Sequence, residues 1–358
     1  MKYLLSGLLA GAILSLLIFQ GVSASELHTG FYFNLSDFDN MQAISPGSSA
    51  DFYVVPHHEK TYLLSGNGHL AKTIEIKDSL SEFSGSGRYY IQYGKVGSSI
   101  ELLGYNGERY WKLASREKPL LSRNGKLILL LIGDHSRIRM FDTNGNPAGV
   151  KEISGRLCTS IEFSEENDFA CFGFADGTYY FLDEKGDVIN KGTLPPGNIV
   201  KGIRISSNGQ FGTVHYGTDQ KDYLRTVNIP DNDSDDEELS SLHVMKTALH
   251  VDNDGRIAIL DNDTFVVFDD DADVIFKVKV PAKRPGQGAI TKLGEYYFVA
   301  YTKNTGESQL YVFTGGGRLF YSKEFAGESY LAAAVRDGSV IVRGSDSLFS
   351  YKIHVSGS

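Results

Sequence analysis

Two short clusters in this sequence carry residue types that could bind a metal ion. The acidic run Pro230 to Leu239 places Asp231, Asp233 and Asp235 at alternating positions, the spacing of a calcium loop. Such a loop has Gly at position six and Glu at position twelve, whereas this run has Asp236 and Leu242 there. We therefore expect a solvated acidic loop and no cofactor, with weak Ca²⁺ binding as the alternative.

The second cluster is the adjacent pair His57 and His58, followed by Glu59. Neighbouring side chains on a strand point to opposite faces, so the two imidazoles are poorly placed to share one ion. The two cysteines, Cys158 and Cys171, are expected to be buried free thiols. In a hairpin that turns at residues 165–167, Cys171 would face Ile161 while Cys158 points to the other side of the sheet.

The sequence lacks the local motifs of common catalytic sites. It has no Gly-x-Ser-x-Gly elbow, no Walker loop and no His-Glu-x-x-His. A fold built from repeats can nevertheless assemble carboxylates from several units without a local motif. No catalytic residue is therefore predicted, while an enzyme is retained as an alternative.

The elements that would position any site come from an internal repeat. The chain has 358 residues, 39 Gly, 9 Pro, 20 Tyr and 21 Phe, which favours many short strands joined by tight turns. Turn residues recur at Gly68, Gly107, Gly145, Gly186, Ala272 and Gly317, with one double gap, at a period of about 42. A second turn precedes each of these, so a unit contains four strands, here named A to D. Four short strands at this period predict an all-β propeller of four-stranded antiparallel blades.

The number of blades follows from the number of units. Strand A is expected to start near Ala43, Ser81, Pro119, Ser160, Gly202, Ala248, Ala289 and Ala332, which gives eight blades. The last unit ends after strand C, and residues 30–35 form an unassigned strand. We expect that strand to pair near Tyr351 and close the ring without an open edge. Seven blades are the alternative, if the acidic fifth unit is a long insertion.

One copy of the unit resembles a known repeat family. Residues 175–186 resemble a WD40 repeat, with Leu182-Asp183 where that family has Trp-Asp; Asp142 and Asp269 fall at the same place. Asp176 would lie in a B–C loop, and these acids are interpreted as turn residues. The only Trp, Trp111, is in a strand D and no Gly-His opens the blades, so the hydrogen-bonded WD40 tetrad is incomplete. The segment Tyr110 to Lys112 resembles PQQ-like propellers, including the eight-bladed outer-membrane assembly propeller. This resemblance implies a propeller architecture over residues 30–355.

The N-terminus indicates export. Residues 3–19 form an apolar stretch after Lys2, and Val22-Ser23-Ala24 offers a cleavage site, which is typical of a signal peptide. We expect residues 1–24 to be a signal peptide, or an uncleaved membrane anchor, before one propeller domain over residues 25–358. No Cys lies near residue 24, so a lipoprotein anchor is not predicted. The expected location is periplasmic or extracellular.

Charge points to the class of partner. The net charge of −9 argues against nucleic acid, which favours basic proteins. In a propeller the B–C and D–A loops share one face, and the A–B and C–D turns share the other. The cations expected on the first face, and predicted to bind a partner there, are Arg116, Lys118, Arg137, Arg156, Lys201, Lys283 and Arg284. The sequence thus predicts an exported, monomeric, non-catalytic scaffold that binds a protein or ligand. The alternative is a lyase or hydrolase with a site at the channel mouth.

Overall fold

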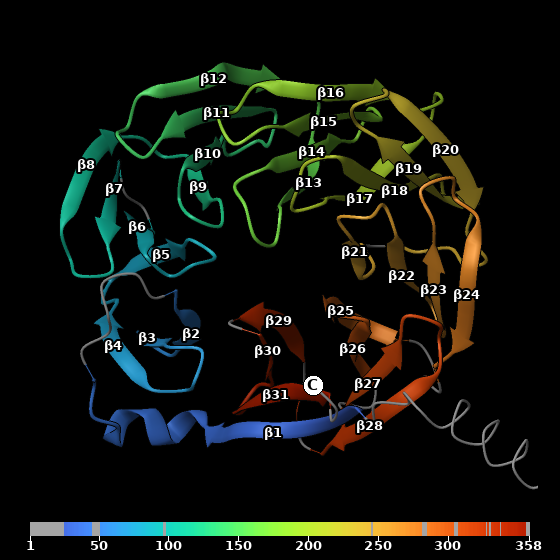
Figure 1. Ribbon diagram of the computed structural model, residues 1–358. Coiled ribbons are helices and arrows are strands. Elements are labelled where there is room, and N and C mark those ends of the chain that lie inside the picture. The colour runs from blue at the N-terminus through green and yellow to red at the C-terminus, as the bar shows by residue number, and fades with distance from the viewer. Residues whose placement is uncertain are drawn as a thin grey trace, which may run out of the picture.

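The computed structural model shows a ring of eight antiparallel sheets around a central channel (Figure 1). It describes residues 25–44, 51–95, 98–244, 246–280, 285–303, 307–326, 328, 331–336 and 338–355. The predicted eight-bladed propeller is confirmed, and its only helix within these ranges is the short 3₁₀ helix η1, Leu35–Asn40. The predicted signal segment, residues 1–24, lies outside the described residues.

Each blade runs from strand A at the channel to strand D at the rim. The second to fourth blades are β5 (Ser79–Phe83), β6 (Tyr89–Gly94), β7 (Ser99–Gly104), β8 (Arg109–Ala114); β9 (Lys118–Leu121), β10 (Leu127–Leu131), β11 (Arg137–Asp142), β12 (Pro147–Ser154); and β13 (Cys158–Phe163), β14 (Ala170–Phe174), β15 (Thr178–Leu182), β16 (Val188–Thr193). The fifth to seventh are β17 (Ile199–Ile205), β18 (Phe211–Gly217), β19 (Asp222–Asn228), β20 (Asp233–Glu238); β21 (Leu249–Val251), β22 (Ile257–Asp261), β23 (Thr264–Phe268), β24 (Val274–Lys279); and β25 (Pro285–Leu293), β26 (Tyr296–Lys303), β27 (Ser308–Thr314), β28 (Leu319–Phe325).

The eighth blade closes the ring as the sequence predicts. It contains β29 (Ala332–Arg336), β30 (Ser339–Arg343) and β31 (Ser347–Val355), and the N-terminal strand β1 (Ser25–Asn34) supplies its strand D. Thr29 of β1 lies opposite Tyr351 of β31. The alternative of seven blades is wrong, because the fifth unit forms a complete sheet whose strand D is the acidic run itself.

The first blade departs from the prediction. Its described strands are β2 (Tyr53–His57), β3 (Lys60–Leu64) and β4 (Leu70–Glu75), which correspond to B, C and D. The strand A expected near Ala43 is not found at residues 41–44, which form no strand, and residues 45–50 lie outside the described residues.

The marker positions of the repeat are explained by backbone geometry. Gly145 and Gly186 lie in the C–D turns of the third and fourth blades with φ of +82° and +84°. Residues that have a Cβ rarely adopt this backbone conformation. Ala272 holds the same place in the sixth blade at φ +65°. A single repeat position therefore needs left-handed backbone in the first seven blades, whose strands C and D are joined by a turn, and this makes the period visible in the sequence.

The core lies between blades, because each sheet presents apolar side chains to both neighbours. One cluster joins the third and fourth blades through Leu129, Met140, Phe172 and Phe174, all fully buried. Burying one such side chain contributes about 1.5–3 kcal/mol. Cys158 and Cys171 are buried and free, as expected. The predicted register is off by one residue, since Cys171 lies opposite Glu162 rather than Ile161.

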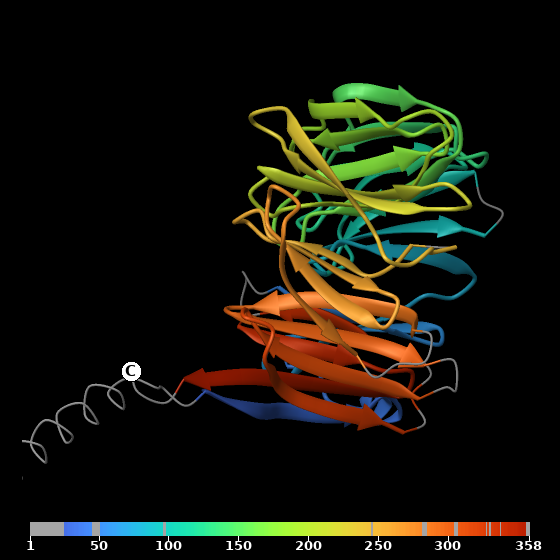
Figure 2. The same ribbon diagram turned by 90° about the vertical axis from the view of Figure 1, so that its right-hand side faces the viewer.

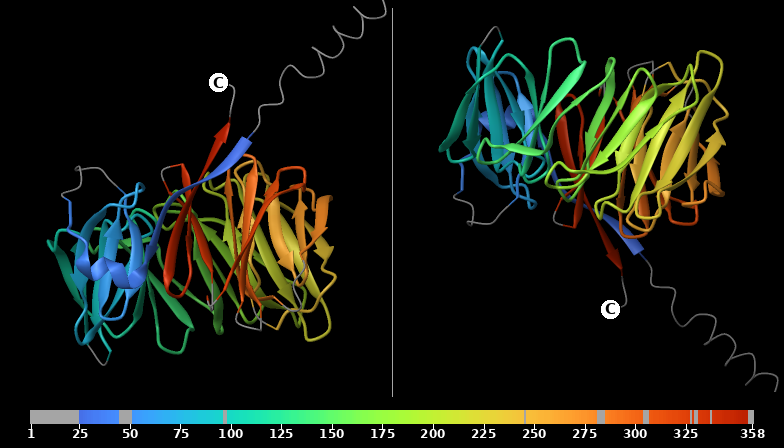
Figure 3. Two further views of the ribbon diagram at one scale, coloured as in Figure 1. Left: turned by 90° about the horizontal axis from the view of Figure 1, so that it is seen from below. Right: turned by 90° about the horizontal axis from the view of Figure 1, so that it is seen from above.

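The two faces of the ring differ in the connections that they carry. The loop face holds the B–C and D–A loops, and the turn face holds the A–B and C–D turns. β1 begins and β31 ends on the turn face, where both extend beyond the ring as a two-stranded ribbon (Figures 2 and 3). Ser25, the first residue that the structure describes, therefore lies on the turn face.

Candidate functional site

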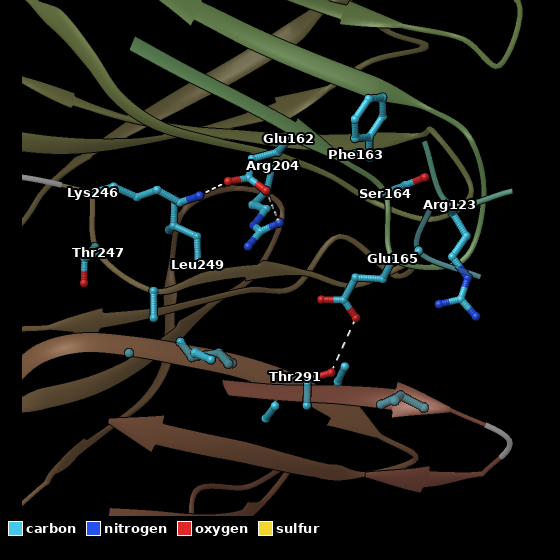
Figure 4. Close-up of a pocket in the computed structure, with 18 of the residues that line it drawn as sticks. Arg123, Glu162, Phe163, Ser164, Glu165, Arg204, Lys246, Thr247, Leu249 and Thr291 are labelled. Carbon is cyan, nitrogen blue, oxygen red and sulfur yellow. Dashed lines mark hydrogen bonds and ion pairs between the residues drawn. The ribbon is translucent and has the colours of Figure 1, made fainter. Parts of the chain in front are cut away.

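The central channel contains a cavity of about 1250 Å³, lined mainly by strands A and the loops that lead into them. The charged wall of this cavity comes from the fourth to sixth blades. The carboxylate of Glu162 on β13 accepts from Nη1 of Arg204 on β17 at 2.7 Å, and pairs also with Lys246 from the loop before β21 (Figure 4). Burial lowers the pKa of Lys246 below its ordinary value. One carboxylate thus serves two cations beside the channel.

A second charged network lies at the turn-face end of the cavity. His250 donates from Nδ1 to Glu165 at 3.0 Å and from Nε2 to Asp252 at 2.7 Å. Carboxylates only accept, so both ring nitrogens carry protons and His250 is an imidazolium. Burial opposes that charge, but the two carboxylates outweigh it and raise the pKa of His250 to about 9. Because neither nitrogen has a free lone pair, this histidine does not act as a base in this arrangement.

The same network ties together distant blades. Asp252 also pairs with Lys292 on β25 and accepts from the Tyr297 hydroxyl of β26 at 2.9 Å. Glu165, from the A–B turn of the fourth blade, reaches the hydroxyl of Thr291 in the seventh blade at 3.4 Å (Figure 4). Glu165 therefore contacts both the sixth and the seventh blade at the turn-face end of the cavity.

A third network lies on the loop face between the fifth and sixth blades. Asp222 is buried, binds the Lys201 ammonium, and accepts from His215 Nε2 at 3.0 Å and from the backbone N–H of His243 at 2.8 Å. Burial would raise the pKa of Asp222, but these hydrogen bonds outweigh it and hold the pKa below its ordinary value. Burial lowers the pKa of His215. The His243 ring pairs in turn with Asp261 at 3.0 Å, a His–Asp link between a D–A loop and the end of a strand B.

The structure describes five of the seven predicted binding cations, and their surroundings differ. Arg116 and Arg137 line a shallow loop-face depression of about 560 Å³, while Lys118 and Arg156 are exposed on the same face. Lys201 is also on that face, but Asp222 and two backbone carbonyls, those of Thr218 and His243, occupy its ammonium. Lys283 and Arg284 lie outside the described residues.

The acidic candidates for calcium do not form the expected loop. Asp231 lies in the C–D turn, whereas Asp233 and Asp235 lie on β20, exposed at the rim of the fifth blade. The expectation of a loop is wrong here, because residues 233–238 pair along their whole length with β19. Across the described ranges, no three His, Cys, Asp or Glu side chains are grouped to hold a metal ion. Calcium binding at this run stays a prediction.

The acids of the WD40-like unit are turn residues, as the repeat predicts. Asp176 accepts from the backbone N–H and hydroxyl of Thr178 in a B–C loop. Asp183 accepts from the N–H groups of Lys185 and Asp187 in a C–D turn, and Asp142 makes the two equivalent bonds in its own blade. Asp269 accepts from the N–H group of Asp273. These carboxylates stabilise turns by local hydrogen bonds.

Sequence reasoning missed the charged wall and an exposed apolar group on the loop face. The repeat itself carries a signal for the first, since Glu162 and Arg204 are 42 residues apart, one period, and so hold equivalent places in adjacent blades. The second, here named the apolar rim, consists of Leu157 (52% exposed), Ile199 (43%), Leu242 (49%) and Val244 (92%). These residues lie on or beside the D–A loops of three consecutive blades, the fourth to sixth.

Comparisons with known proteins establish the fold. No protein-family model and no curated protein matches the chain in sequence. The crystal structure of BamB from Moraxella catarrhalis is similar at a TM-score of 0.61 and 13% identity, over 91% of this chain and 98% of that one. The C-terminal WD40 domain of Sif2 matches at 0.60 and 11%, over the same shares. Kluyveromyces lactis Hsv2 matches at 0.54 and 12%, over 75% of this chain and 94% of that one. At these identities the likeness is one of architecture, and it confirms the predicted similarity to WD40-type and BamB-type propellers.

Within the described ranges there is no helix of the length and apolar character needed to span a membrane.

Proposed function

We propose that this protein is an exported, monomeric, non-catalytic scaffold that binds a partner protein on its loop face. The observation that carries this proposal is the apolar rim. Scattered apolar side chains are ordinary on a surface, but a group beside a cavity mouth is typical of an interaction site. Leu242 and Val244 also line the cavity, so the part of the rim that they form is continuous with the channel.

The neighbouring charge supports a protein partner. Arg156 is exposed beside Leu157 on the same D–A loop. An apolar centre with arginine at its border is the composition of protein interfaces, where aromatic and arginine side chains are enriched. A partner with complementary acidic groups would associate faster and in a defined orientation.

The position of the termini supports the same face. Ser25 lies on the turn face, so an N-terminal anchor would direct the loop face away from the membrane. If the signal peptide is removed instead, both faces are free. The apolar rim is accessible to a partner in either case.

Site-specific photo-cross-linking tests the docking face. A photoreactive residue placed at Val244 in the full chain, produced in its native cells, should form one dominant cross-link to a partner protein. The matched control is Val274, 46% exposed at the start of β24 at the rim of the ring. Cross-links of equal yield from both positions, or from neither, would contradict the proposal.

Export is tested separately by N-terminal sequencing of the protein recovered from those cells. We expect the envelope or secreted fraction to contain the protein with Ser25 as its first residue. Retention in the cytoplasm would contradict export, and an intact N-terminus in the membrane fraction would identify the segment as an anchor.

A further inference from the structure

The channel cavity has the size and the chemistry of a ligand site. Its volume of about 1250 Å³ exceeds the ~300–1,000 Å³ of typical small-molecule pockets. Small residues on the seventh and eighth blades create this space, namely Gly288, Ala289, Ala333 and Ala334. One wall is therefore apolar and unobstructed, and the opposite wall carries charge.

The charged side of the cavity has more cations than the local carboxylates neutralise. Glu162 faces both Arg204 and Lys246. Asp51, at the turn-face end, faces both Arg88 at 2.9 Å and Arg123 at 3.1 Å. Among the residues that line the cavity itself, the three cations Arg123, Arg204 and Lys246 stand against the two carboxylates of Glu162 and Glu165. This excess occurs inside a chain whose net charge is −9.

The two arginines that line the cavity have spare hydrogen-bonding capacity. A guanidinium has five N–H donors. Nε of Arg204 and Nη1 of Arg123 have no acceptor among the residues that the structure describes, but both atoms are shielded from the cavity, so a ligand reaches them only if the side chain turns toward it. Arg204, 26% exposed, is the more accessible of the two, and Arg123 is 11% exposed. In such a setting a carboxylate from a ligand forms strong, charge-assisted hydrogen bonds.

The loop-face mouth of the cavity connects this charge with the apolar rim. Leu242, Val244 and Thr247 lie around that mouth, whereas Glu165, which contacts His250 and Thr291, lies at the turn-face end. An occupant that enters there passes the apolar rim before it reaches Arg204. A segment of a docked protein meets both conditions, since it can contact the rim and extend inward.

From these features we propose that the channel cavity binds an acidic peptide segment of the partner, with its carboxylates at Arg204 and Arg123 and its apolar side chains against Ala289 and Ala333. The inference rests on the proposed docking of a partner on the loop face.

Peptide binding to the full chain, measured by fluorescence anisotropy, tests the inference. The probe is a short labelled peptide of alternating glutamate and leucine, and a lysine–leucine peptide is the charge-reversed comparison. We expect the acidic peptide to bind with an affinity that falls as salt is added, and the basic peptide to give no signal.

The test variants replace one of the two cations that pair with the same carboxylate. Arg204→Gln leaves Glu162 paired with Lys246, and Arg123→Gln leaves Asp51 paired with Arg88, so neither change strands a buried carboxylate. Each should weaken acidic-peptide binding about tenfold or more, the effect of losing one hydrogen bond to a charged group. Lys191→Gln, on the exposed rim strand β16, is the matched control and should bind as the wild type does.

The outcomes separate this inference from the docking proposal. No peptide binding, or equal binding by wild type and both arginine variants, would overturn the inference. Competition by succinate as strong as that by the unlabelled peptide would overturn it in favour of a small dicarboxylate ligand. If Val244 still cross-links to a partner in those cases, the docking proposal stands alone. Peptide binding without any Val244 cross-link would instead overturn the docking face.

Discussion

The turn face and the loop face each bury a histidine beside an aspartate, but the ring on the turn face is positively charged and the ring on the loop face is neutral. His250 on the turn face has a carboxylate at both nitrogens, at 3.0 and 2.7 Å. His215 on the loop face has one, Asp222, and its Nδ1 is buried with no partner among the described residues. An unpaired Nδ1 suits a neutral ring with its proton on Nε2. The number of carboxylates around each ring therefore sets its charge.

The comparison also shows how the two faces differ in role. On the turn face, His250 links the fourth and sixth blades through Glu165, and its partners Asp252 and Glu165 contact Lys292 and Thr291 of the seventh blade. On the loop face Asp222 anchors the D–A loop through the backbone of His243, and the residue that follows, Val244, is 92% exposed. The turn-face network links blades across the channel, whereas the loop-face network fixes the base of an exposed loop.

The largest expected effect comes from breaking the loop-face network at Asp222. Asp222→Ala leaves the Lys201 ammonium, whose side chain is 12% exposed, without its carboxylate. Removing one partner of a buried pair costs about 3–5 kcal/mol, because the remaining charge is uncompensated. We expect a loss of this order in the free energy of unfolding, measured by urea denaturation.

Two further variants sharpen this prediction. Adding Lys201→Met to Asp222→Ala removes the stranded charge and should recover part of the loss. Asp263→Ala breaks the exposed pair of Asp263 with Lys279 and should cost less than about 1 kcal/mol. If Asp222→Ala costs no more than Asp263→Ala, the buried network does not anchor the loop.

The next largest effect is pH-dependent and belongs to the turn face. The pKa of His250 is raised to about 9, above its ordinary value near 6.5. A group whose folded pKa is raised stabilises the fold fully below about pH 6.5, and that contribution is lost as pH rises through about 9. His250→Gln should therefore cost on the order of 3 kcal/mol at pH 6 and progressively less toward pH 10.

The measurement is the thermal midpoint of wild type and His250→Gln across this pH range. We expect the two curves to converge as the wild-type histidine loses its proton. A constant gap between pH 6 and pH 10 would show that packing, not charge, makes His250 important. His215→Gln is the comparison variant, and its gap from wild type should not narrow above pH 7, because that ring is already neutral.

The sequence predicts the fold well because the fold is built from a local rule repeated along the chain. Left-handed turn positions such as Gly145 and Gly186 must recur wherever two strands join tightly, so they mark every blade. Ring closure by β1 follows from the same count, because the last unit lacks one strand. The register predicted for β13 and β14 is wrong by one residue, because the alternation of side chains does not fix the length of the turn between the two strands.

The candidate site is much less predictable for a physical reason. Glu162, Arg204 and Lys246 meet only because strands A of successive blades converge on one axis. Lys201 illustrates the converse, because its position on the loop face was predicted while its capture by Asp222 was not. Charged residues on such loops can be assigned to a face from the sequence. Their partners depend on how far each side chain is buried, which the sequence does not show.

The smallest expected effect on stability separates the exposed loop from its anchor. Val244→Ser changes a side chain that is 92% exposed and contributes little to the core, so the free energy of unfolding should move by less than about 0.5 kcal/mol. The matched control is Val267→Ser in β23, fully buried, which should cost about 2 kcal/mol or more.

If Val244 contacts a partner, Val244→Ser should weaken the recovery of the partner that cross-links at this position while the melting curve stays unchanged. A loss of stability as large as that of Val267→Ser would show that Val244 belongs to the core of the fold. The base of the loop, held by Asp222, and its exposed tip at Val244 would then not differ in role.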